Sequence, residues 1–180
     1  NNMMVLTSAV NYGFRRTMPH MVGIAIGFGV MNVLVGLGLG QVFERWPVIY
    51  SGMKIIGSLY LLWLAWGIAR AGNVEGSKAG SAPLSFLQAA MFQWVNPKAW
   101  VISVGAIAAY TLPGRYSFSV LAIGLVMTIV TLPCVMVWAG FGSALRNVLS
   151  NPANLKLFNW AMALLLVASL WPIVADLVVK

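Results

Sequence analysis

Long apolar runs that carry almost no charge dominate this chain and decide what it can fold into. A helix needs roughly 20 predominantly apolar residues to cross the hydrocarbon core of a bilayer. Five runs reach about that length: Thr17 to Gly40, Val48 to Ala69, Leu84 to about Tyr110, Tyr116 to Leu145, and Leu157 to Ala175. Because lipid offers the backbone no hydrogen-bond partners, these runs are expected to be helices. The sequence therefore predicts an all-α membrane protein.

The composition agrees with this class. Hydrophobic residues make up 61% of the chain and charged residues only 8%, and the mean hydropathy is +0.88. A soluble domain carries about 25% charged residues. The net charge of +8 could suggest a nucleic-acid partner, but the eleven basic residues are scattered and form no basic helix. We therefore expect no nucleic-acid binding, and the lipid bilayer is the expected partner.

A sixth, shorter apolar run opens the chain. It extends from Met3 to Val10, and Arg15 and Arg16 follow before it is long enough to cross a bilayer. We interpret it as the second half of a first span whose front half is missing from this sequence. The expected architecture is a single transmembrane domain, residues 1–180, folded as a six-span helical bundle with its first span partial. A connector rich in Gly, Ser and Ala, from Ala71 to Pro83, divides it into halves of about 1–70 and 84–180.

Lysine and arginine residues between the runs fall unequally on the two sides of the membrane. One side receives Arg15, Arg16, Arg70, Lys78, Arg146 and Lys156. The other side receives Arg45, Arg115 and Lys180, with Lys54 just inside its run. Cytoplasmic loops carry the excess of positive charge, so we expect the first side to be cytoplasmic and both ends of the chain to lie outside.

The run from Leu84 to Tyr110 has Asn96-Pro97-Lys98 at its middle. A lysine near mid-membrane costs on the order of 2.5–3.5 kcal/mol, and Pro97 tends to break the helix and to free backbone groups that then need partners. A cation, an amide and a broken helix at one depth indicate a polar site inside a membrane protein. The alternative is a proline kink with a lysine that reaches the surface, but about 11 residues separate Lys98 from either end of the run. We expect Lys98 to face the bundle interior.

The two halves of the chain show a faint internal repeat. Ala25-Ile26-Gly27 and Ala122-Ile123-Gly124 match at an offset of 97 residues, and this offset places Pro97 opposite the position just before Asn1. It pairs the first span with the fourth and the second with the fifth, so each half has three spans. Since three is odd, the halves form an inverted repeat, in which paired broken helices meet at mid-membrane. The start of the chain is therefore expected near the break at Asn96.

With these features the chain resembles the LysE/RhtB family of bacterial amino-acid exporters over essentially its whole length. The motifs that carry the resemblance are Asn1-Asn2 before an apolar run, Gly13-Phe14-Arg15-Arg16, Lys54-x-x-Gly57-x-x-Tyr60-Leu61-x-Trp63, and Gln93-Trp94-Val95-Asn96-Pro97-Lys98-Ala99. Family members usually carry Pro-Gly-Pro before the asparagine that matches Asn1 or Asn2, and this sequence lacks it. The resemblance implies a multi-pass transporter of the bacterial inner (plasma) membrane that exports amino acids or close derivatives, driven by a proton gradient or the membrane potential. It implies no cofactor and no covalent chemistry.

The residue types suggest how an amino-acid substrate would be held. Lys98 would pair with the carboxylate, helped by positive helix ends exposed at the breaks. Asn1, Asn2 or Asn96 would offer carbonyl oxygens to the ammonium group. Together with Pro97, which breaks the helix, these are the candidate substrate-binding residues.

Proton coupling has fewer candidates. The only acids, Glu44, Glu75 and Asp176, lie in connectors or near an end of the chain, so no carboxylate is expected at mid-membrane. Lys98 is one candidate relay and His20 is another. A lone histidine close to the membrane boundary is, however, more often just an interfacial residue.

Two other classes of protein are alternatives to a transporter. A membrane enzyme would need a nucleophile with a base, or a set of metal ligands, yet Cys134 is the only cysteine and His20 the only histidine. We therefore expect neither enzyme activity nor a metal site. A non-transporting structural subunit of a membrane complex stays open, although it would not need Lys98 at mid-membrane. The sequence does not name the amino acid, and it leaves open whether chains assemble into a homo-oligomer.

Overall fold

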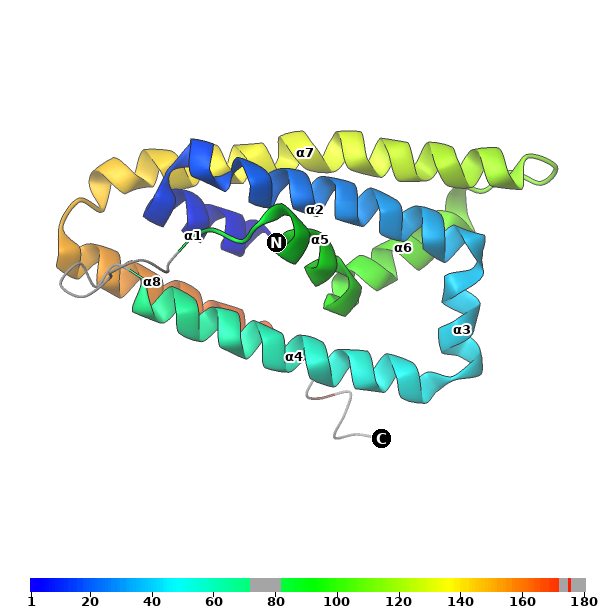
Figure 1. The fold of residues 1–180 in the computed structure, drawn as a ribbon, viewed down its shortest axis with the longest axis horizontal. Helices are drawn as coiled ribbons and strands as arrows, with labels where there is room; N and C mark the ends of the chain where they lie inside the picture. The colour runs from blue at the N-terminus through cyan, green and yellow to red at the C-terminus, as the bar shows by residue number, and fades with distance from the viewer. Residues whose placement is uncertain (72–81, 172–174, 176–180) are drawn as a thin grey trace.

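The computed structural model describes residues 1–71, 82–171 and 175, and its helices are labelled as in Figure 1. In these residues the fold is helical, as the sequence predicts, with eight α-helices and one short segment, η1, in which the chain kinks at Gly38 with φ 114°. They are α1 (Asn2–Tyr12), α2 (Phe14–Leu34), η1 (Val35–Leu39), α3 (Gly40–Arg45), α4 (Pro47–Arg70), α5 (Phe86–Val95), α6 (Pro97–Tyr110), α7 (Tyr116–Val148) and α8 (Pro152–Ala168).

Three stretches of helix within the described residues are long and apolar enough to cross a membrane: Phe14–Leu39, Ser51–Arg70 and Tyr116–Val148. Each coincides with a predicted run. The last predicted run corresponds to α8, which has 17 residues, and residues 172–174 and 176–180 lie outside the described part. The six-span count therefore stays a prediction.

The remaining predicted run is interrupted at Asn96, as expected. Val95 ends α5, and Asn96 has an extended backbone with φ −91° and ψ 106°. Its side-chain Oδ1 accepts a hydrogen bond from the Lys98 N–H at 3.1 Å and so caps α6. Pro97 is the first residue of α6, a position where its missing N–H leaves no hydrogen bond unmade. The sequence thus dictates both the end of one helix and the start of the next.

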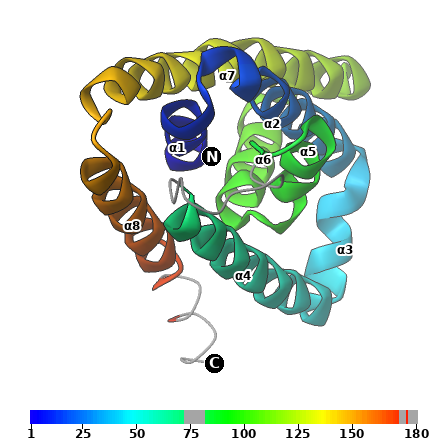
Figure 2. The same ribbon diagram turned by 60° about the vertical axis from the view of Figure 1, so that its left-hand side comes forward.

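The long helices α2, α4 and α7 run roughly along the longest axis of the molecule (Figure 1). Helix α2 packs against α7 and α5, and α4 packs against α8. Figure 2 shows α1 inside this arrangement, with α7 on one side and α4 and α8 on the other. Helices α1 and α6 both start near the centre and run toward opposite ends (Figure 1).

Glycines bring α5 close to its neighbours. A Cβ atom added at Gly23 would meet the Phe86 carbonyl oxygen, and one added at Gly57 would meet the Val95 carbonyl oxygen. Backbones approach this closely only where one helix has no side chain, which is how small residues promote the packing of membrane helices. Helix α5 is therefore held between α2 and α4, with its broken end fixed against α4.

Three connections meet at one end of the bundle, on the left in Figure 1, which we call the basic end. They are the turn between α1 and α2 at Gly13, the end of α4, and the turn between α7 and α8. Gly13 lies against the guanidinium group of Arg146, because an added Cβ atom would be 2.8 Å from a guanidinium nitrogen. Asn159 of α8 hydrogen-bonds both to Asn11 of α1 and to the Ala71 carbonyl at the end of α4.

The basic residues divide between the two ends as the sequence predicts. The helix ends at the basic end carry Arg15, Arg16, Arg70, Arg146 and Lys156. The opposite end carries Arg45 and Arg115, and there Tyr116 Oη donates a hydrogen bond to the Gly36 carbonyl at 2.8 Å. Lys78 and Lys180 lie outside the described residues. Which end is cytoplasmic stays a prediction.

Two predicted connectors are wrong in their extent. The apolar runs leave Arg146 to Lys156 as a connector, but α7 continues to Val148 and α8 begins at Pro152. Glu44 and Arg45 likewise belong to α3. Hydropathy marks where the hydrocarbon ends, whereas a helix continues into water as long as its backbone hydrogen bonds are satisfied. Of the connector between Ala71 and Pro83, residues 72–81 lie outside the described part, so the division into halves stays a prediction.

The outward faces of the helices are apolar. On α7, Leu125, Ile129 and Phe141 are 61%, 60% and 61% exposed. Contiguous apolar surface is rare on soluble monomers, and lipid is the solvent that such a surface fits.

Candidate functional site

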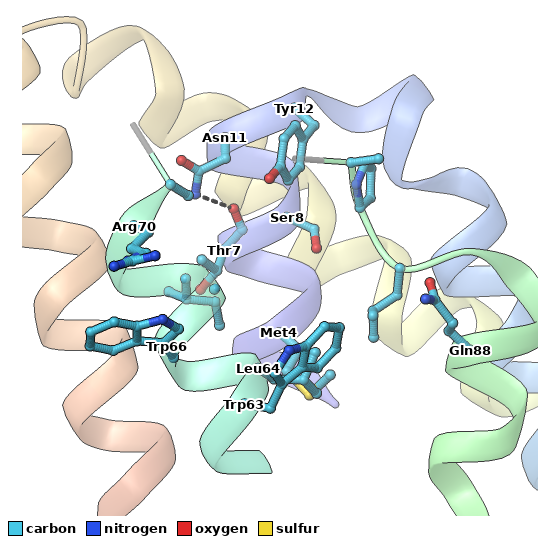
Figure 3. Close-up of a pocket in the computed structure, with 16 residues that line it drawn as sticks. Met4, Thr7, Ser8, Asn11, Tyr12, Trp63, Leu64, Trp66, Arg70 and Gln88 are labelled. Carbon is cyan, nitrogen blue, oxygen red and sulfur yellow. Dashed lines mark hydrogen bonds between the residues drawn. The ribbon is translucent and has the colours of Figure 1, made fainter. Parts of the chain in front are cut away.

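The described residues line a cavity of about 620 Å³ next to the basic end, between α1, the C-terminal part of α4 and the segment that leads into α5 (Figure 3). This volume falls within the roughly 300–1,000 Å³ of typical ligand pockets. The lining residues are Met4, Thr7, Ser8, Asn11, Tyr12, Trp63, Leu64, Trp66, Gly67, Ile68, Arg70, Ala71, Ala82, Pro83, Leu84 and Gln88.

One face of α1 supplies the polar wall. Thr7, Ser8, Asn11 and Tyr12 have the spacing that places residues on the same side of a helix, and all four line the cavity. Thr7 Oγ1 donates to the Met3 carbonyl at 2.7 Å, and Asn11 Nδ2 donates to the Thr7 carbonyl at 2.9 Å. These bonds satisfy polar groups within the helix and leave side-chain oxygens at the cavity wall.

Ser8 connects this wall to a buried histidine. Its Oγ lies 3.2 Å from Nδ1 of His20 on α2. His20 is only 1% exposed, so it is enclosed by the bundle, and the interpretation as an exposed interfacial residue is wrong. The reason is that the chain reverses at Gly13, so that α2 runs back along α1 and α1 covers the imidazole ring.

Arg70 brings a positive charge to the cavity. It is the last residue of α4, and its guanidinium carbon lies 4.4 Å from the centre of the Trp66 ring. A cation over an aromatic face is attracted to it, which holds the guanidinium group in place. The planar fork of N–H donors matches a carboxylate, and no Asp or Glu lines the cavity among the residues whose side chains the structure describes. The described walls therefore suit the carboxylate of an amino acid.

Apolar side chains separate the cavity from the helix break. Met4, Leu64 and Phe92 belong to one buried cluster. Tyr60 packs beside them, its ring 5.5 Å from that of Trp63 and 5.8 Å from that of Phe92. Along α1 and α5, the residues beyond this layer are those of the break itself.

At the break, the start of the chain lies beside α5, as the sequence predicts. Asn1 and Gln93 exchange two hydrogen bonds: Asn1 Nδ2 donates to Gln93 Oε1 at 2.8 Å, and Gln93 Nε2 donates to Asn1 Oδ1 at 3.1 Å. Gln93 is fully buried and also donates to the Ala89 carbonyl at 2.9 Å. Asn96 is three positions after Gln93, so two of the predicted site residues come from segments that meet here.

Lys98 is exposed on the single chain, and the prediction that it faces the bundle interior is wrong in this respect. Helix α6 buries Ala99 and Trp100, whereas Lys98 shares its exposed face with Val101 and Ile102. Trp100 sets this rotation, because its Nε1 donates to the Trp94 carbonyl across the break at 2.7 Å. The indole therefore takes the inward position that the sequence suggested for the lysine.

None of the predicted site residues lines the cavity. Asn1 and Asn96 lie on the two segments that meet at the break, Pro97 starts α6, Lys98 is exposed, and Asn2 is exposed in the first turn of α1. Sequence reasoning missed the cavity and Gln93. The signal for the cavity was the polar face Thr7, Ser8, Asn11 and Tyr12 within an otherwise apolar helix.

Within the part of the chain that the structure describes, no three His, Cys, Asp or Glu side chains come together as a metal site. The prediction of no metal site rests on the residue types, since the three acids of the chain have side chains outside the described part.

Comparisons with known proteins agree with the resemblance seen in the motifs. The family model for the LysE type translocator matches residues 1–169. The homoserine/homoserine lactone efflux protein of Salmonella typhimurium is 26% identical over 161 residues, covering 87% of this chain and 78% of that protein. The cysteine/O-acetylserine efflux protein of Klebsiella pneumoniae is 25% identical over 171 residues, covering 93% of this chain and 84% of that protein.

The protein with the same name from Escherichia coli (strain K12) is 27% identical over 169 residues, covering 93% of this chain and 85% of that protein. No solved structure matches the chain. Translocators and efflux proteins are transporters and not enzymes, in line with the absence of a catalytic group from the sequence motifs. With residues 1–169 matched, the chain belongs to the LysE type translocator family.

Proposed function

We propose that this protein exports small amino acids with uncharged side chains, or close derivatives of them, from the cytoplasm across the bacterial inner membrane. The named relatives act on homoserine, homoserine lactone, cysteine and O-acetylserine, which share an ammonium group and lack a charged side chain. The observation that carries the proposal for this chain is the cavity at the basic end, with a cation on one wall and hydroxyl and amide oxygens on another.

In this proposal the cavity is the binding site that opens to the cytoplasm. Arg70 takes the substrate carboxylate, because an arginine fork donates two parallel hydrogen bonds to it. Oxygens of Ser8 and Asn11 accept from the ammonium group. A second cation on the substrate would meet Arg70 and, among the described lining residues, no carboxylate, so lysine and arginine are expected to be poor substrates. Trp63 and Trp66 limit the side chain that fits.

The helix break is the second binding site on the path of the substrate. We propose that Lys98 takes over the carboxylate there, and that Asn1, Asn2 and Asn96 accept from the ammonium, with Pro97 keeping the helix open. A lysine at this depth is costly against hydrocarbon, so its exposed side chain needs water, substrate or another chain beside it. Tyr60, Trp63 and Phe92 lie between the two binding sites and would have to move for the substrate to pass.

The inverted repeat belongs to the same proposal. Helices α1 and α6 start near the centre and run to opposite ends (Figure 1), which is the course that two related half-helices take in an inverted repeat. Alternation of the two halves about the break would expose the site first to one side and then to the other. A proton gradient or the membrane potential supplies the energy.

The test is exchange in proteoliposomes that contain the purified full chain. Vesicles loaded with unlabelled homoserine are placed in labelled homoserine, cysteine, O-acetylserine, lysine or glutamate. We expect exchange of the first three and little of the last two. Exchange of lysine alone would overturn the substrate class, and no exchange of any amino acid would overturn export in favour of a structural subunit. Collapsing the pH gradient and the membrane potential separately, with ionophores, then identifies the driving force.

A further inference from the structure

A buried histidine contacts one hydroxyl group that lines the cavity. His20 is the only histidine of the chain and is 1% exposed. Its Nδ1 lies 3.2 Å from Ser8 Oγ, and its Nε2 is buried without a hydrogen-bond partner among the described residues. Ser8 lines the cavity, and Figure 3 shows its hydroxyl among the side chains around it. A change of protonation at His20 can therefore reach the cavity through a single contact.

The direction of the Ser8 hydrogen bond depends on the charge of His20. A serine hydroxyl donates one hydrogen bond and accepts two, whereas a neutral imidazole has one acceptor nitrogen and a charged one has none. When Nδ1 of neutral His20 accepts, Ser8 donates to it and both lone pairs of Oγ stay free for the cavity. When His20 is charged, Nδ1–H donates to Ser8, which uses one lone pair and turns the hydroxyl proton away from the ring. A nearby positive charge then also repels a cation in the cavity.

The charged groups on α2 and on the helices packed against it are all basic among the described residues. Helix α2 itself carries Arg15 and Arg16, and α5, packed against it, carries none. Helix α1 brings Tyr12, α7 brings Cys134, Arg146 and Tyr116, and α6 brings Lys98 and Tyr110. In these packed helices no carboxylate stabilises a charged His20, so burial favours the neutral ring and a proton on His20 is held only weakly.

We propose that Ser8 is the acceptor for the substrate ammonium in the cavity, and that protonation of His20 weakens this acceptor, because it occupies one of the two lone pairs of Oγ and places a positive charge beside it. A proton on His20 and an amino acid at Ser8 then weaken each other's binding. The inference rests on the proposed export function and gives it a coupling mechanism: uptake of the substrate releases a proton from His20, and uptake of a proton releases the substrate. Because linkage is reciprocal, each ligand weakens the other by the same factor.

This coupling also defines the chemical class of the ligand. It acts only on substrates that present an ammonium group to Ser8. The α-hydroxy acid with the same side chain keeps the carboxylate for Arg70 but has a hydroxyl that can donate or accept. Its binding should depend much less on the charge of His20.

The experiment measures the half-saturating concentration for exchange against pH, in proteoliposomes of the full chain, with the amino acid of the panel above that exchanges fastest. For the wild type it should rise toward acidic pH, because a proton on His20 weakens substrate binding. His20→Gln and His20→Asn should keep exchange but lose this rise, and they should no longer concentrate substrate when only a pH gradient is imposed. Asn32→Ala is the matched control, because Asn32 is a second fully buried polar residue of α2, bonded to the Phe28 carbonyl.

Ser8 provides a second variant that does not alter the buried ring. Ser8→Ala should weaken substrate binding and remove its pH dependence. Ser8→Thr, which keeps the hydroxyl, should retain the binding and the pH dependence of the wild type. If His20→Gln and Ser8→Ala exchange substrate with the wild-type pH dependence, the coupling proposal is overturned while export stands. If the wild type exchanges no amino acid of the panel, export fails and the coupling fails with it.

Discussion

Asn11 of α1 and Asn159 of α8 hold each other by two hydrogen bonds. Asn11 Nδ2 donates to Asn159 Oδ1 at 2.8 Å, and Asn159 Nδ2 donates to Asn11 Oδ1 at 3.0 Å. Asn159, which is fully buried, also donates to the Ala71 carbonyl at 2.7 Å. Two short amides thus join the ends of α1 and α4 to the middle of α8 beside the cavity, where each helix alone would leave a polar group unpaired.

Asn159→Ala should destabilise the protein by about 2–4 kcal/mol, because it leaves the Asn11 amide and the Ala71 carbonyl without partners in a buried position. The free energy of unfolding, or the thermal midpoint of the detergent-purified protein, measures this. Asn147→Ala is the control: Asn147 is exposed near the end of α7 and should change stability by no more than about 0.5 kcal/mol. Equal effects of the two substitutions would contradict the role of the bridge.

Because α2 and α5 pack closely, replacing a glycine by alanine should change the thermal midpoint differently at their contact and on the open face of α7. A Cβ atom at Gly27 would lie 2.5 Å from the Ala90 Cα, whereas one at Gly140 in α7 would meet nothing within 4 Å. Gly27→Ala should therefore lower the thermal midpoint. Gly140→Ala should leave it unchanged or raise it, because alanine is favoured over glycine in a helix by roughly 0.5–1 kcal/mol. A stable Gly27→Ala protein would show that the two helices can separate without cost.

The position of the apolar runs and of the break was predictable from the sequence. Apolar length marked Phe14–Leu39 and Tyr116–Val148 to within a few residues. Proline chemistry placed the break, since Pro97 has no N–H to donate and Asn96 is a good helix cap. Helix ends beyond the hydrocarbon, as at Arg146, were not predictable from hydropathy.

The cavity was not predictable, because it depends on how three helices pack. Arg70 was visible only as a loop charge, and its contact with Trp66 requires the fold of the helix end. The face that Lys98 takes depends on Trp100, whose bond across the break forms only once α5 and α6 are placed. The burial of His20 depends on α1 folding back over α2, which the lone histidine in the sequence does not reveal.

Arg70→Gln should raise the half-saturating concentration for homoserine by about 5–30-fold, since a partly exposed charge-assisted pair contributes roughly 1–2 kcal/mol. Homoserine lactone has no free carboxylate, so the same substitution should change its exchange little. Arg16→Gln is the control, because Arg16 is an exposed arginine of the basic end that does not line the cavity. An equal loss for homoserine and its lactone would mean that Arg70 supports the fold and does not bind the carboxylate.

Efflux of a preloaded, labelled amino acid from cells tests most directly whether this protein carries amino acids out through the helix break. The wild type, Lys98→Ala and the exposed control Lys156→Ala are compared at equal amounts of membrane-inserted protein. Lys98→Ala removes a charge that is costly at this depth, so it should insert as well as the wild type. The proposed function predicts efflux from the wild type and from Lys156→Ala, and at least a tenfold loss, equivalent to about 1.4 kcal/mol, from Lys98→Ala. Wild-type efflux from Lys98→Ala would contradict the assignment of the break as a substrate site.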